Sequence, residues 1–151
     1  MKLADLLHAA RRLVQAGPEG RAFAARAWLA APVIQGSLTL LGLRTTLRWV
    51  EAIPAGKRRR GTPGVREGEA LVRGAFKVHV VKGECLPRSL VQLLVHRRAG
   101  LPARLVVGVH RPALGERLEA HAWLEDPAEP TGAADPHFAP LLVVEPWERA
   151  A

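Results

Sequence analysis

Hydrophobic residues recur at helical spacing through the first half of the chain. Apolar residues three or four positions apart predict a helix over residues 3–15, which Gly17-Pro18 ends. The same spacing predicts helices over 20–31 and 36–52. Pro32 should end or kink the first of these two. This half is therefore expected to be helical.

The second half changes from helical spacing to short apolar runs. Helices are predicted over 66–79 and 86–98, the latter ending at Ala99-Gly100, a typical C-cap. Strands are then predicted over 103–110, 118–125 and 141–145, with a short one near 130–135. Helices first and strands last indicate an α+β fold with an antiparallel sheet.

A change in composition divides the chain of 151 residues. Residues 55–64 are rich in Gly, Pro and positive charge and include the basic run Lys57–Arg60, which is typical of a flexible, solvated linker. We therefore predict an N-terminal helical region (1–54), a basic linker (55–65) and a C-terminal core (66–151).

The net charge of +8 is unevenly distributed. There are 13 basic and 5 acidic residues up to Phe76, but 9 of each from Lys77 onward. The first half could meet an anionic partner, or its cations could simply solvate helix faces and a loop.

The longest uncharged stretch, 27–43, is interrupted by Pro32 and Gly36 and falls short of the roughly twenty apolar residues that span a membrane. It predicts buried or interfacial helices, without membrane association.

The first residues lack the apolar region of a signal peptide, and one cysteine fits a reducing compartment. A cytoplasmic location is expected.

Cys85 is the only cysteine and stands at the predicted start of the helix over 86–98. Free N–H groups and the positive end of the helix dipole stabilise negative charge there, which suits a nucleophilic thiol. The alternative is that Cys85 is a small buried hydrophobic residue.

His121 lies on the predicted strand over 118–125. Alternate strand residues share a face, so His121 should lie with Trp123 and Glu125. A cysteine at a helix start beside a strand histidine is the arrangement that thiol acyl-transfer enzymes need, although a lone histidine can also be structural. The positions expected to face the core are Ala120, Ala122 and Leu124.

A third group should orient the imidazole. If residues 127–129 form a hairpin turn, regular pairing places Asp135 opposite His121, on the same face. Asp126 is an even-numbered position, so strand alternation places it on the face opposite His121, and it also lies in the turn. Asp135 is therefore the candidate acid, although an Asp before Pro136 is also a common turn residue.

Several motifs together resemble the leader peptidases of lasso-peptide maturation, the lasso-peptide B proteins. The motifs are Cys85-Leu86-Pro87-Arg88-Ser89-Leu90, Arg97-Arg98-Ala99-Gly100-Leu101-Pro102-Ala103, Gly108-Val109 and Ala120-His121-Ala122-Trp123-Leu124-Glu125. The helices before them, with Arg21, Trp28 and Arg48-Trp49, are similar to the same family. The chain resembles the stand-alone peptidase half of a split B protein.

This resemblance implies a papain/transglutaminase-like fold and a cysteine peptidase with Cys85 as nucleophile and His121 as base. It implies removal of the leader from a lasso-peptide precursor before macrolactam formation, without a cofactor or metal. The implied partners are the precursor leader, a small precursor-recognition protein and the ATP-dependent lasso cyclase. The family's acid lies about a dozen residues beyond the histidine, where this chain has Ala133, so Asp135 is the nearest fit.

Three other functions are compatible with the residues. The same triad would serve a transglutaminase-like amidase or other acyl-transfer enzyme. A catalytically silent scaffold of the same fold would need only the packing. Nucleic-acid binding through Lys57–Arg60 is disfavoured, because aromatic residues do not alternate with this short basic run. We therefore expect no nucleic-acid partner.

Overall fold

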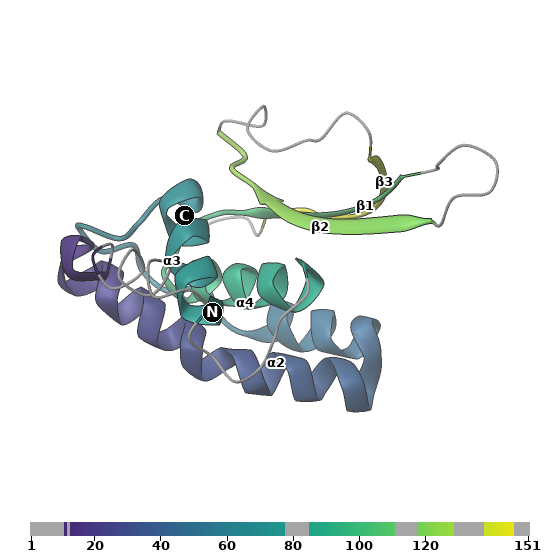
Figure 1. Ribbon diagram of the computed structural model, residues 1–151, viewed down its shortest axis with the longest axis horizontal. Coiled ribbons are helices and arrows are strands. Elements are labelled where there is room, and N and C mark those ends of the chain that lie inside the picture. The colour runs from purple at the N-terminus through teal and green to yellow at the C-terminus, as the bar shows by residue number, and fades with distance from the viewer. Residues whose placement is uncertain (1–10, 12, 78–84, 111–117, 129–137, 147–151) are drawn as a thin grey trace.

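The computed structural model describes residues 11, 13–77, 85–110, 118–128 and 138–146. Within them, a layer of helices packs against one side of a small sheet (Figure 1). The predicted strand near 130–135 and most of the predicted helix over 3–15 lie outside the described residues.

Helix α2 (Gly17–Ala52) is a helical hairpin, because its direction reverses at Gly42. Gly42 has φ 76° and ψ 172°, a conformation that is essentially restricted to glycine. The helix does not end at Pro32, which lies inside helical backbone. Across the reversal, the hydroxyls of Ser37 and Thr46 lie 2.8 Å apart, and Thr46 also donates to the Gly42 carbonyl.

Helices α3 (Val65–Lys77) and α4 (Cys85–Arg98) agree closely with the predicted ranges. Most of α4 is buried, because α2, α3 and the sheet all pack against it. One continuous hydrophobic core joins these elements and includes Phe23 and Ile34 of α2, Leu90 of α4 and Leu105 of the sheet. The helix that begins at Cys85 therefore lies between the other helices and the sheet.

The sheet has three antiparallel strands in the order β2-β1-β3. They are β1 (Arg104–His110), β2 (Glu119–Glu125) and β3 (Ala139–Val144). The predicted α+β class with an antiparallel sheet is therefore confirmed.

The segment after α2 lies against the C-terminal end of α4. The Gly56 N–H donates to the Arg97 carbonyl at 2.9 Å. Gly100 ends α4 with φ 69°, and a side chain there would come within 2.7 Å of the Arg58 nitrogen. The backbone after α2 and the backbone at the end of α4 can approach closely because each has a glycine there, Gly56 and Gly100.

None of the helices in the described ranges is long and apolar enough to cross a membrane.

Candidate active site

Two side chains at the start of α4 hold that end of the helix against strand β2. The Cys85 thiol donates to the Ala120 carbonyl, with 3.8 Å between sulfur and oxygen. One helical turn later, the Ser89 hydroxyl donates to the Ala122 carbonyl at 2.8 Å. Carbonyls two residues apart point to the same side of a strand, so the helix start follows one edge of β2.

Two of the three predicted site residues, Cys85 and His121, lie on these two packed elements. His121 lies between the two carbonyls that Cys85 and Ser89 contact. Cys85 and His121 are both half-buried, so each keeps some access to solvent. The thiol and the imidazole therefore belong to two packed elements, α4 and β2, and both are partly accessible to solvent.

The imidazole of His121 is supported along its own strand. Its ring stacks on Trp123, with 5.9 Å between centroids and 19° between planes. The Trp123 indole donates to Glu125 at 3.0 Å, and Glu125 lies 3.8 Å from the Arg104 guanidinium. The predicted shared face of His121, Trp123 and Glu125 is confirmed.

The opposite face of β2 differs from the prediction at one end. Ala122 and Leu124 are buried as expected, but Ala120 is exposed. Ala120 is the second residue of β2, and its carbonyl contacts Cys85 at the first turn of α4. The expectation that Ala120 faces the core was therefore wrong.

Phe138 and His110 also belong to the site, and both were missed in the sequence. The Phe138 ring lies 5.6 Å from His121, 5.8 Å from His110 and 6.5 Å from Trp123, measured between centroids. Phe138 directly precedes β3, the strand on the far side of β1. An isolated phenylalanine before a strand gives no signal of this contact.

Gly108 makes room for these rings. It is the residue of β1 paired with His121, and a Cβ at this position would lie 2.8 Å from Cη2 of Trp123 and 3.0 Å from the Phe138 Cβ. Real Cβ atoms rarely come so close to other atoms, so a side chain here would displace the indole that supports His121.

Asp135 lies outside the described residues, so its place in a triad stays a prediction. Within the sheet, the residue beside His121 is Gly108, and the side chains of Cys85 and Ser89 occupy the other edge of β2 at this level. In the described part of the chain, no group of three or more His, Cys, Asp or Glu side chains could hold a metal ion.

Comparison with known protein families gives a match over residues 28–143, to a model described as the Transglutaminase-like superfamily. The matched region runs from the first arm of α2 to β3 and contains both Cys85 and His121. No curated protein and no solved structure matches the chain.

Proposed function

Because the chain belongs to the transglutaminase-like superfamily, which includes cysteine peptidases, we propose that it is a cysteine peptidase that removes the leader from a lasso-peptide precursor. The observation that carries this proposal is the contact of the Cys85 thiol with the carbonyl directly before His121. The motifs around Cys85 and His121, which resemble lasso-peptide B proteins, supply the substrate class.

In the first chemical step, His121 accepts the thiol proton and the Cys85 sulfur attacks the carbonyl carbon at the leader–core junction. The N–H of Cys85, in the first turn of α4, is proposed to donate to the developing oxyanion. The C–N bond then breaks, and His121 gives its proton to the leaving amine of the core peptide.

In the second step, a water molecule attacks the thioester carbonyl while His121 accepts a proton from that water. The C–S bond breaks, the leader leaves as a free acid, and the thiol recovers its proton. Asp135 is proposed to orient the imidazole.

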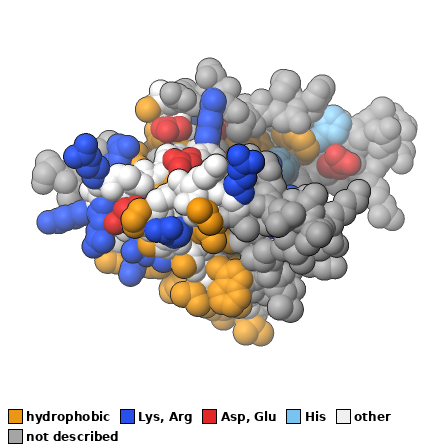
Figure 2. Space-filling view, turned by 60° about the vertical axis from the view of Figure 1, so that its left-hand side comes forward, with side chains coloured by type: hydrophobic (Ala, Val, Ile, Leu, Met, Phe, Trp, Pro, Cys, Tyr) orange, Lys and Arg blue, Asp and Glu red, His pale blue; other side chains and the backbone are white. Residues whose placement is uncertain are grey.

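The apolar surface of α2 supports docking of a small precursor-recognition protein. Figure 2 shows hydrophobic side chains gathered on one part of the surface, with basic side chains beside them. Exposed large hydrophobic residues concentrate on α2: Trp28, Leu29, Val33, Leu40, Leu41 and Trp49. A cytoplasmic setting, with the lasso cyclase acting on the released core, belongs to the same proposal.

The test is to incubate the protein with a lasso precursor and its recognition protein and to measure product masses. Wild type should release an intact leader and core. Cys85→Ala should abolish cleavage, and His121→Ala should slow it by about 100- to 10,000-fold. An uncleaved precursor with wild type, or unchanged cleavage with Cys85→Ala, would exclude the peptidase.

The same masses distinguish the other acyl-transfer function. An added primary amine that becomes joined to the leader in place of water would indicate an amidase or transferase instead. In that case Cys85 and His121 keep their roles while the proposed hydrolysis is wrong.

A further inference from the structure

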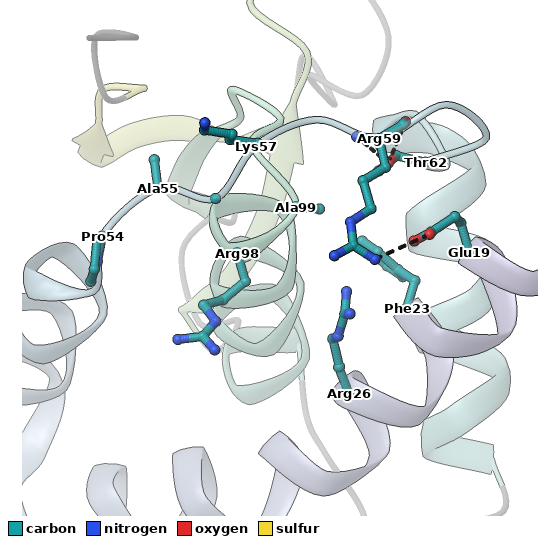
Figure 3. Close-up of a pocket in the computed structure, with 11 residues that line it drawn as sticks. Glu19, Phe23, Arg26, Pro54, Ala55, Lys57, Arg59, Thr62, Arg98 and Ala99 are labelled. Carbon is teal, nitrogen blue, oxygen red and sulfur yellow. Dashed lines mark hydrogen bonds and ion pairs between the residues drawn. The ribbon is translucent and has the colours of Figure 1, made fainter.

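A cavity of about 500 Å³ lies where the first arm of α2, the segment after α2 and the end of α4 meet (Figure 3). Four cationic side chains line it: Arg26, Lys57, Arg59 and Arg98. Glu19 is the single acidic residue among the described residues that line it. We call this hollow the cationic cavity.

The wall formed by the basic segment is hydrogen-bonded to neighbouring backbone. Besides the hydrogen bond from Gly56 to Arg97, Arg97 donates through Nε to the Ile53 carbonyl. The Thr62 hydroxyl donates to the Arg59 carbonyl at 2.7 Å and lies 3.2 Å from the Arg59 N–H. The backbone of this segment therefore lies against the end of α4, and its exposed cations project from there.

The charges within the cavity are only partly balanced. Arg59 lies 3.6 Å from Glu19, and Figure 3 shows the guanidinium groups of Arg26 and Arg59 pointing toward one another. Like charges that converge in this way repel each other, and an anion between them removes that repulsion. Guanidinium groups favour carboxylate and phosphate oxygens.

We propose that the cationic cavity binds an acidic segment of the peptide substrate. This inference rests on the proposed peptidase function. The cavity adjoins the last residues of α4 and Cys85 is the first, about 20 Å away along a helix of this length. An extended peptide spans that distance with about six residues, so the carboxylates should lie at least that far from the scissile bond.

A nucleic acid fits the cavity less well than a peptide. Base binding uses exposed aromatic faces, whereas Phe23, the one aromatic side chain that lines the cavity in the described structure, is 1% exposed. A purely structural role is the other competing explanation, because cations near the C-terminus of α4 also offset the helix dipole.

Binding can be measured by fluorescence anisotropy with a labelled hexaglutamate peptide, using Cys85→Ala protein so that no cleavage occurs. The double variant Arg26→Ala/Arg98→Ala should weaken binding at least about tenfold. The matched control is Arg58→Ala/Arg60→Ala, which removes the same charge from exposed positions outside the cavity and should change affinity less than about threefold. Glu19→Gln should strengthen binding, which damage to the fold would not do.

Competitors separate the possible ligands. Hexaglutamine should not displace the probe. Displacement by inorganic phosphate or single-stranded DNA at lower concentrations than by unlabelled hexaglutamate would overturn the peptide assignment. So would absence of binding, or equal losses in the two double variants. Since Cys85→Ala protein is used, a failure of this proposal is distinct from a failure of the peptidase proposal.

Discussion

His96 is a fully buried histidine outside the candidate active site. Its Nδ1 lies 2.8 Å from the Gln92 carbonyl oxygen, and its ring meets Phe23 edge-on at 5.0 Å between centroids. Burial lowers the pKa of His96 below its ordinary value of 6.5, and the backbone of Gln92 and Gly64 and the charge of Asp126 oppose this only in part.

The lowered pKa of His96 makes stability depend on pH in a definite direction. The contribution of neutral, buried His96 to the free energy of unfolding is complete above pH 6.5. It is lost as the pH falls from there through the folded-state pKa, because the unfolded chain takes up a proton that the folded protein excludes. Urea unfolding should therefore give a lower free energy of unfolding at about pH 5 than at about pH 7.5. His96→Gln removes the titration and should show a smaller difference, while an equal difference would contradict this account.

At the residue scale, the sequence indicated a helix start at Cys85 and a shared face for His121 and Trp123, because helix starts and strand alternation are local properties. Gly108 stood out only as part of a motif, and its physical role depends on rings from two other segments. Phe138 and His110 could not be found, since the contacts of Phe138 with His121 and with His110 depend on the strand order.

At the scale of elements, the reversal of α2 is the largest departure from expectation. Proline suggested a break because it removes a hydrogen bond. The structure breaks the helix ten residues later, where a glycine adopts a backbone conformation closed to other residues.

Two glycines of α2 provide a matched test of this reversal. A Cβ at Gly42 or at Gly36 would meet nothing within 4 Å, so only the backbone distinguishes them. Gly42→Ala should cost about 1–3 kcal/mol, because φ 76° and ψ 172° are strained for alanine. Gly36→Ala, in regular helix, should stabilise by about 0.5–1 kcal/mol. Thermal unfolding measures both, and equal shifts would contradict a reversal at Gly42.

At the scale of the whole molecule, α4 connects the two regions to which we assign function. Its first residue carries the thiol beside β2, and its last turn forms part of the cationic cavity. Composition alone did not show that Gly56 and Gly100 allow the basic segment to touch the end of α4. The division into residues 1–54, 55–65 and 66–151 stays a prediction.

The pairing of Cys85 with His121 is the central claim, and the reactivity of the single thiol tests it most directly. Cys85 is the only cysteine in the chain, so the rate of alkylation by iodoacetamide at neutral pH reports on this residue alone. His110→Ala is the control, because His110 also contacts Phe138. We predict that His121→Ala slows alkylation at least about tenfold and His110→Ala less than about threefold. Alkylation of His121→Ala at the wild-type rate would contradict the account.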